Sequence, residues 1–427
     1  MWLTISRTVL TLGTCLFAAC STPTQTAQTK DFTASNTNSA AHPQKDEQLI
    51  EQSSTNQNSG RLVVQNATVN SFDTQKTTPL KSKNSPLFVP FRRDYVQKDG
   101  QLSPYLEQWA LHLSQQRRIP YPHIEALLKQ VSYEPQVIKL MTPAKGKRGK
   151  RSWSAYQERF TDKTRIDDGL SFWRRHQDII EQTAQKYQIP ASVLVAIIGV
   201  ETIYGSYMGD FSVLNALTNL GFGYPDPERP ERATMFRNQL ADLIELHYQG
   251  KLDANTARGS FAGAMGLPQF MPTSIKQWAI DADGKGHIDL FHSVPDALAS
   301  VANFLNHHGW QAPLPVFIDV EIPANSQIAN KVDGGLSPTL DWQELQAPLG
   351  LPEQPSVYAQ QKLGLVDLPD QVHNTVEYRL ASANFFALTE YNRSYFYASA
   401  VADLACALER RHYQRQNCSL WASPDSQ

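Results

Sequence analysis

A carboxylate in an apolar setting is the first candidate for chemistry in this chain of 427 residues. Glu201 follows an apolar run that begins at Ala191, and on a helix its neighbours three and four positions back are Ile198 and Ile197. Apolar surroundings disfavour the ionised carboxylate and raise its pKa, as a general acid near neutral pH requires. A helix-end glutamate paired with an arginine or held by hydrogen bonds fits this single feature equally well.

A loop rich in small residues is the second candidate. The segment Gly259-Ser-Phe-Ala-Gly-Ala-Met-Gly-Leu-Pro-Gln-Phe-Met-Pro272 has small side chains that let the backbone pass close to a ligand or to another segment. Ser260 and Gln269 add hydrogen-bonding groups to it. Taken alone, this composition favours the simpler interpretation of a tight structural loop packed under a core.

A third segment, residues 281–289, has the spacing of an EF-hand-type calcium loop. Such a loop takes oxygen ligands at positions 1, 3 and 5 and has glycine at position 6. Asp281 and Asp283 match positions 1 and 3, and His287 at position 7 is a further candidate ligand. Position 5 is Lys285, whose ammonium group cannot coordinate a cation. The sequence therefore favours a metal-free turn held by a Lys285 salt bridge over calcium binding.

Several familiar chemistries have no motif in this sequence. It contains no His-Glu-x-x-His, no Gly-x-Ser-x-Gly, no glycine-rich phosphate loop and no Cys-His metal spacing. The formal net charge of -2 gives no strong field that would favour DNA, RNA or an anionic membrane as a partner. The basic cluster of residues 145–151 is best explained as a solvated loop, with contact to an acidic polymer as the alternative.

Helices are expected to position most of these residues, because apolar side chains recur with helical periodicity along much of the chain. The expected helices span residues 104–141 with breaks at Pro120 and Pro122, 153–187, 190–205, 232–249, 273–280, 294–308 and 394–411. Between residues 312 and 380 prolines are frequent, and β-rich stretches occur at 316–322 and 375–380. The expected fold class is α+β, mainly α, with a small β-rich insertion.

The first twenty residues are expected to be a lipoprotein signal peptide. The apolar stretch that follows Arg7 is too short to span a membrane, and Leu16-Phe-Ala-Ala-Cys20 resembles a bacterial lipobox, which implies lipidation of Cys20. Ser21 after it is typical of transfer to the outer membrane. An ordinary secretory signal cleaved near Ala19 is the alternative. Residues 21–85 are polar and few of them are apolar, so they are expected to form a disordered tether with a reach of about 45 Å.

Two cysteines remain in the exported protein once Cys15 is removed and Cys20 is lipidated. These are Cys406 and Cys418, and an oxidising compartment allows them to pair. Free buried thiols are nearly as well supported by the sequence.

The motifs, taken in order, resemble those of one known family. Glu201-Thr-x-x-Gly205, Ser260-Phe-Ala-Gly-Ala-Met-Gly-x-x-Gln-Phe-Met-Pro272 and Tyr391-Asn-Arg-Ser-Tyr-Phe-Tyr397 are similar to motifs of the membrane-bound lytic murein transglycosylase B family. The resemblance extends from about Leu87 to Arg411. It implies a lysozyme-like catalytic core at residues 153–311, a helical domain at 86–152, a small β-rich domain at 312–380, and the rest of the core with the tail at 381–427.

The resemblance also implies the chemistry. Members of the family cleave the β-1,4 bond between N-acetylmuramic acid and N-acetylglucosamine and leave a 1,6-anhydro end, and their catalytic glutamate falls on Glu201. The positions that contact saccharide in the family are here Tyr156, Arg232, Ser260, Gln269, Tyr391, Asn392 and Tyr397. Two positions depart from the family pattern. Phe304 replaces an aromatic residue that carries a hydroxyl and keeps only its stacking surface, and an arginine pair is reduced to Glu231-Arg232.

Cofactor, partners and location follow from the same resemblance. No cofactor is required, and a calcium loop, if present, would close with Asp296. The expected partners are peptidoglycan glycan strands and the outer membrane through the lipid anchor, with a cell-wall synthesis complex as a further candidate and no nucleic acid. The expected location is the periplasm of a Gram-negative bacterium. A hydrolytic muramidase and an inactive peptidoglycan-binding lipoprotein remain the alternative functions.

Overall fold

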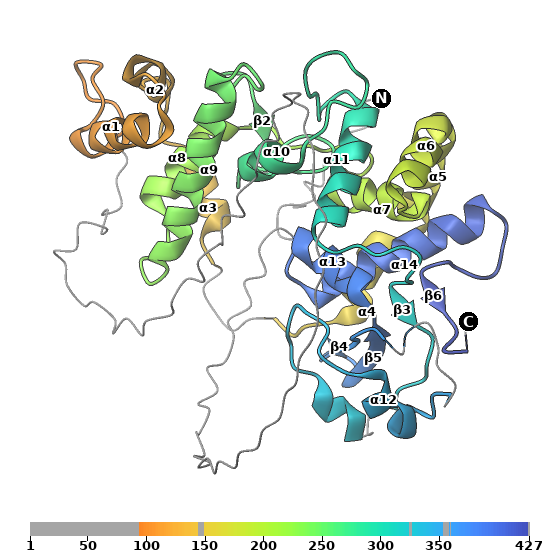
Figure 1. The fold of residues 1–427 in the computed structure, drawn as a ribbon. Helices are drawn as coiled ribbons and strands as arrows, with labels where there is room; N and C mark the ends of the chain where they lie inside the picture. The colour runs from red at the N-terminus through yellow and green to blue at the C-terminus, as the bar shows by residue number, and fades with distance from the viewer. Residues whose placement is uncertain (1–93, 144–148, 324–326, 353–357, 359, 426–427) are drawn as a thin grey trace, which may run out of the picture. The chain divides into compact units, whose positions relative to one another are not determined.

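The computed structural model describes residues 94–143, 149–323, 327–352, 358 and 360–425 (Figure 1). The expected signal peptide with Cys20, the expected tether of residues 21–85 and most of the basic cluster lie outside the described residues. Among the residues that are described, none of the helices combines the length and the apolar composition needed to span a membrane.

Helix α7 (Ala191–Thr202) lies at the centre of the helical core, and every residue up to Gly199 is buried. A helix that is apolar on all sides can only be accommodated inside a protein, which the composition of this segment requires. Four helices pack around it: α5 (Lys163–Arg175), α6 (Gln177–Tyr187), α11 (Val294–His307) and α14 (Tyr395–His412) (Figure 1). The end of α7 that carries Glu201 is therefore held from several directions.

The remaining helices complete the mainly α fold that the sequence predicts. They are α1 (Pro104–Arg117), α2 (Tyr121–Leu128), α3 (Pro135–Met141), α4 (Trp153–Thr161), α8 (Val213–Gly223), α9 (Pro230–Tyr248), α10 (Pro272–Trp278), α12 (Trp342–Leu349) and α13 (Ala383–Tyr391). The predicted helices are confirmed, with three differences in their bounds. The stretch of residues 153–187 is divided into three, the stretch 104–141 has a further break between α2 and α3, and the helix expected at 190–205 ends at Thr202. At the junction of α4 and α5 the side chain of Asp162 accepts a hydrogen bond from Arg165 N and caps α5. Sequence reasoning missed α8, α12 and α13.

A four-stranded sheet forms the β-rich part, with the strand order β4-β5-β3-β6. Its strands are β3 (Phe317–Ile318), β4 (Gly364–Asp370), β5 (Thr375–Ala381) and β6 (Trp421–Ala422), and a separate pair joins β1 (Phe211–Ser212) to β2 (Arg258–Gly259). The strand expected at 316–322 is shorter than predicted, because only Phe317 and Ile318 find partners on β5. Strand β6 comes from the C-terminal tail and pairs in parallel with β3. A small apolar core of its own supports the sheet, and the division into domains remains a proposal.

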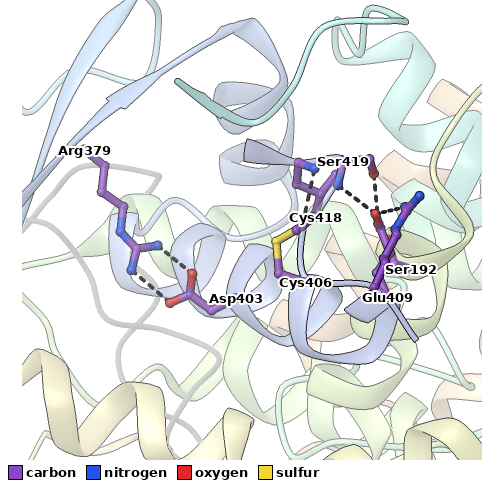
Figure 2. The surroundings of a disulfide bond; sticks show 9 residues. Ser192, Arg379, Asp403, Cys406, Glu409, Cys418 and Ser419 are labelled. Carbon is purple, nitrogen blue, oxygen red and sulfur yellow. Dashed lines mark hydrogen bonds and ion pairs between the residues drawn. A yellow bond between two sulfur atoms is a disulfide. The ribbon is translucent and has the colours of Figure 1, made fainter. Parts of the chain in front are cut away.

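A buried arginine joins the sheet to the helical core. Arg379 on β5 is 5% exposed and donates to both carboxylate oxygens of Asp403 on α14, at 2.7 and 2.9 Å. Its guanidinium also lies 5.3 Å from the ring centroid of Trp153 on α4 and 5.1 Å from that of Trp421 on β6. Figure 2 shows the Arg379–Asp403 pair beside the disulfide region. Since a buried charge needs such partners, Arg379 fixes how these elements meet.

The tail is anchored to α14 by a disulfide and by a buried carboxylate. Cys406 and Cys418 are paired, so the structure selects one of the two alternatives that the sequence left open. Glu409, 2% exposed, accepts hydrogen bonds from Ser192 Oγ at 2.8 Å and from Ser419 N at 2.7 Å (Figure 2). The tail that these contacts hold in place supplies strand β6.

We expect the disulfide to contribute measurably to stability, because it restricts the unfolded chain. Replacing both Cys406 and Cys418 by serine should lower the free energy of unfolding by about 3 kcal/mol, since the bridge closes a short loop. Urea unfolding of the two proteins measures the difference. Reductant should destabilise the wild type and leave the double variant unaffected, and a difference below about 0.5 kcal/mol would contradict the expectation.

Candidate active site

The site centres on Glu201, the second-last residue of α7, whose side chain is half-buried. The hydroxyl of Tyr397, near the start of α14, donates a hydrogen bond to Glu201 Oε1 at 2.6 Å. Oε1 is thus occupied by a donor, and a proton on this carboxyl group belongs on Oε2. Glu201 therefore presents one specific oxygen for proton transfer.

Burial raises the pKa of Glu201 from 4.5 to about 7, and the hydrogen bond from Tyr397 opposes part of this rise. Desolvation penalises the charged carboxylate, whereas a donor favours it. Within the part of the chain that the structure describes, these two effects account for the shift, without an arginine or a second carboxylate. The sequence alternative of a glutamate paired with an arginine is therefore not what the structure shows. Its other form, a helix-end glutamate that accepts a hydrogen bond, does occur, with Tyr397 as the donor.

Two tyrosines line the carboxyl group and hold their hydroxyl protons. The rings of Tyr391 and Tyr397 are stacked with centroids 6.4 Å apart, and the Tyr391 hydroxyl donates to Pro268 O at 2.8 Å. Burial, followed by the negative charge of Glu201, raises the pKa of both phenols well above the usual value. They act as hydrogen-bond donors at neutral pH, and neither is suited to be a base.

The hydroxyl of Ser260 is oriented by its own loop. Ser260 follows β2, and its Oγ accepts hydrogen bonds from Ala264 N at 3.0 Å and from Ala262 N at 3.3 Å. With both lone pairs directed at main-chain donors, the hydroxyl hydrogen is left to donate elsewhere. Gly263, in the left-handed region with φ +89°, makes this tight turn possible because a side chain there would collide with Leu217.

The amide of Gln269 is oriented in the opposite sense. Gln269 is 8% exposed, and its Nε2 donates to Met208 O at 3.1 Å and to Gly266 O at 3.0 Å. Both amide hydrogens are used, so Oε1 remains as an acceptor. Ser260 and Gln269 therefore offer a donor and an acceptor of fixed direction.

The other predicted residues differ in how closely they join this group. Tyr156 on α4 contacts the ring of Phe396, with the centroids 5.4 Å apart. Asn392 lies in the link between α13 and α14, where its main-chain carbonyl oxygen accepts a hydrogen bond from Ser394 N. Arg232 on α9 donates from Nε to the Tyr224 hydroxyl at 3.4 Å.

Phe304 packs against Tyr391 and exposes little of its own ring. Its ring is 6% exposed, stacks on His308 at 4.0 Å and meets Tyr391 at 4.9 Å in an edge-on arrangement. The stacking surface expected from the sequence is thus largely covered by protein side chains, and Phe304 holds Tyr391 in position.

Two functional groups escaped sequence reasoning because they belong to the main chain. The carbonyl of Met208 orients Gln269, and the carbonyl of Pro268 orients Tyr391. Neither residue type signals such a role. The glycines and prolines around them were the available clue, since they mark close backbone approaches.

The acidic loop holds a second cluster of charged side chains, apart from the residues around Glu201. Carboxylate oxygens of Asp281, Asp283 and Asp296 lie within 4.8 Å of one another, and Lys285 Nζ lies 2.9 Å from Asp283 Oδ2. The ion pair holds the pKa of Asp283 below its usual value. This is the salt bridge that the metal-free alternative expects, and the donor set lacks the ligand at position 5. His287 is exposed and is not part of the cluster. The metal-free turn held by Lys285 therefore stays the prediction for this loop.

Comparison with known proteins shows which proteins this chain is similar to. A family model described as "Transglycosylase SLT domain" matches residues 102–406. The chain is 34% identical over 294 residues to the membrane-bound lytic murein transglycosylase B of Escherichia coli strain K12, covering 67% of this chain and 77% of the relative.

Solved structures show the same likeness. The catenated lytic transglycosylase SltB1 of Pseudomonas aeruginosa is 32% identical with a TM-score of 0.65, over 73% of this chain and 98% of that one. SltB3 of Pseudomonas aeruginosa, solved with NAG-NAM-pentapeptide, is 30% identical with a TM-score of 0.60, over 71% of this chain and 79% of that one.

Removing the Tyr397 hydroxyl should raise the pKa of Glu201 further. In Tyr397→Phe the carboxylate loses its donor while burial remains, so we expect the pKa to rise above about 7 by roughly one unit. Carbon NMR of labelled glutamate carboxyl groups measures the titration. Tyr395→Phe is the matched control. Tyr395 lies on the same helix as Tyr397, but its hydroxyl donates to Gly335 O, so its removal should leave the pKa of Glu201 unchanged. An unchanged pKa in Tyr397→Phe would mean that this bond does not favour the carboxylate.

Replacing Lys285 should decide whether the acidic loop can take calcium. We expect the Tm of the wild type to be the same in calcium and in chelator, because the ammonium group already neutralises part of the cluster. Lys285→Asp should gain about 3 °C or more in calcium, since binding to the folded state stabilises it. Lys285→Gln, which removes the charge without adding a ligand, is the control. No shift in Lys285→Asp would count against a latent site.

Proposed function

We propose a reaction for Glu201 on the premise that this chain belongs to the family of lytic transglycosylases that carry a transglycosylase SLT domain. The enzyme has a lysozyme-like catalytic core, and its substrate is the glycan strand of peptidoglycan. It cleaves the β-1,4 bond between N-acetylmuramic acid and N-acetylglucosamine and leaves a 1,6-anhydromuramic acid end. The relative solved with NAG-NAM-pentapeptide supports this substrate class.

One observation carries the assignment of the acid to Glu201. A carboxyl group with a pKa of about 7 is protonated in a large fraction of molecules near neutral pH and can also lose its proton there. A general acid that must later act as a base is most effective when its pKa lies near the working pH. An ordinary glutamate would be almost fully ionised and unable to begin the reaction.

The first step is proton transfer to the leaving oxygen. Glu201 Oε2 gives its proton to the glycosidic oxygen while the bond from that oxygen to C1 of the muramic acid breaks. The electron pair of that bond stays with the departing sugar, and positive charge develops at C1 and the ring oxygen. The carboxylate that forms is stabilised by the hydrogen bond from Tyr397 to Oε1.

The second step closes the ring without water. The 6-hydroxyl oxygen of the same muramic acid bonds to C1, and its proton returns to Glu201 Oε2. Typical glycosidases use a second carboxylate as a nucleophile or to activate water. Neither role is needed when the attacking group is held in the same molecule, and intramolecular attack also carries a large advantage in rate. The reaction needs no cofactor.

The polar groups of the loop are suited to read the sugars. The Ser260 hydroxyl donates, so it fits an acceptor such as an acetamido carbonyl oxygen, and Gln269 Oε1 fits a hydroxyl or an amide N–H. Tyr156, Tyr391 and Asn392 are the further candidates for contact with sugar, and Arg232 provides a positive charge for a carboxylate of the substrate. Phe304 acts through Tyr391.

Two other functions remain as outcomes of the test. A hydrolytic muramidase would let water attack C1 and release a reducing end. A peptidoglycan-binding lipoprotein without activity would bind the wall without cleaving it, and the intact Glu201, Ser260 and Gln269 argue against that function.

The protein acts in the periplasm. The E. coli relative is named as membrane-bound, which supports an anchor for this chain as well. In this proposal Cys20 carries lipid that holds the protein on the outer membrane, and residues 21–85 form the tether. A cell-wall synthesis complex is a further candidate partner.

The test is digestion of purified cell-wall sacculi, followed by mass spectrometry. The wild type should release anhydro products, which are lighter by one water than the products of hydrolysis. Glu201→Gln should bind the sacculi but lose activity by at least about 10³-fold, because the amide cannot donate the acid proton.

Melting curves provide the folding control for this variant. The raised pKa means that Glu201 disfavours the folded state as pH rises through about 7, so Glu201→Gln should be at least as stable as the wild type at pH 8. Reducing-end products would establish the muramidase, an inert wild type would favour the binding protein, and full activity of the variant would remove Glu201 from the mechanism.

A further inference from the structure

The chain leaves α7 through an unusual left-handed turn directly behind Glu201. Ile203, Tyr204 and Gly205 follow one another with φ angles of +52°, +54° and +87°. Glycine adopts such angles freely, but a β-branched isoleucine and a tyrosine do so only when surrounding contacts impose the conformation. Strained backbone of this kind is concentrated at functional sites, so the contacts that enforce it are informative.

The ring of Tyr204 fills a slot lined by two glycines. A methyl group on Gly199 would lie 2.5 Å from Tyr204 Cζ, and one on Gly169 would lie 2.4 Å from Tyr204 Oη. Gly199 belongs to α7 and Gly169 to α5, so the ring is inserted where the two helices meet. Phe172 packs against it with ring centroids 5.6 Å apart, and Arg165 Nη1 donates to Gly199 O at 2.6 Å.

The turn also connects Glu201 to the loop that carries Gln269. Thr202 Oγ1 lies 3.1 Å from Leu267 O and accepts a hydrogen bond from Gly205 N, also at 3.1 Å. Three residues further on, Met208 provides the carbonyl that accepts from Gln269 Nε2. A change in the path of the turn would therefore displace the end of α7 and the amide of Gln269 together.

We propose that Tyr204 is a positioning residue for the reaction, and that its ring in the Gly169–Gly199 slot holds the left-handed turn that places Glu201 and Gln269 relative to each other. This inference rests on the proposed function of Glu201. Tyr204 contacts α7 at Gly199, on the side away from Glu201. Gly199 and Glu201 are two positions apart on α7 and so lie on nearly opposite sides of the helix.

The ring and not the hydroxyl carries this role. The Tyr204 hydroxyl is buried, and no described residue forms a hydrogen bond with it. A buried donor without a partner destabilises the folded state, so its removal should do no harm. Tyr204→Phe should keep kcat and KM within about twofold of the wild type and leave the Tm equal or higher, as a ring-filling role requires.

Removing the ring should separate catalysis from stability. In Tyr204→Ala, assayed well below its Tm, we expect kcat to fall by at least about tenfold while KM changes by less than about threefold, because misplacement of an acid affects the chemical step most. Tyr358→Ala is the matched control. Tyr358 is 2% exposed in the separate core of the sheet, so its loss should lower the Tm and leave kcat unchanged. If Tyr204→Ala likewise lowers only the Tm, Tyr204 is a structural residue and the inference is wrong.

A double-mutant cycle tests the slot independently of activity. Gly199→Ala should lower the Tm in the wild type, because the new methyl group collides with the ring. In the Tyr204→Ala background the same substitution should raise the Tm, since alanine favours a helix more than glycine does and the slot is then empty. Equal effects in both backgrounds would overturn the proposed packing. A wild type without activity on sacculi would instead refute the proposed function, whatever the cycle shows.

Discussion

The properties of the site depend on how much water reaches one carboxyl group. Burial of Glu201 disfavours its charge and the Tyr397 hydroxyl favours it, and the two effects leave the pKa at about 7. If burial acted alone, the carboxylate formed in the first step would be too costly to generate. If the carboxyl group were exposed, it would lack a proton at the start. In the reaction that we propose, this balance allows Glu201 to act first as an acid and then as a base.

This balance is produced by elements far apart in the sequence. Helix α7 provides the apolar surroundings, whereas the hydroxyl comes from α14, 196 residues further along the chain. The place of α14 is fixed by the Cys406–Cys418 bridge and by the ion pair of Asp403 with Arg379. The sheet and the tail contain none of the proposed sugar contacts, yet both hold the helix that carries Tyr397. In the proposed reaction, their contribution is to keep the Tyr397–Glu201 hydrogen bond of 2.6 Å in place.

The sequence predicted the features that depend on local patterns. The helical periodicity placed Glu201 among apolar neighbours on a helix, and prolines marked several helix starts, such as Pro190 before α7. Strand β4, the partner of β5, was not predicted, since its sequence includes a proline and alternates only weakly. Strand β6 could not be predicted because two tail residues become a strand only when long-range contacts, including the disulfide and the Glu409 hydrogen bonds, hold the tail beside β3. The direction of the Gln269 amide was equally hidden, because a main-chain carbonyl 61 residues away decides it.

The polar side chains of the site share one property: main-chain atoms fix the direction of each. Ser260 and Gln269 each use their other hydrogen-bonding capacity on main-chain atoms, and Tyr391 does the same through Pro268. A side chain restrained in this way loses little freedom when a sugar binds and does not need to reorient as charge develops. The glycines of the loop make these main-chain contacts sterically feasible, so the small residues that looked like a structural loop are what orients the functional ones. The two interpretations of the loop are therefore compatible: its tight packing is what directs the Ser260 and Gln269 side chains.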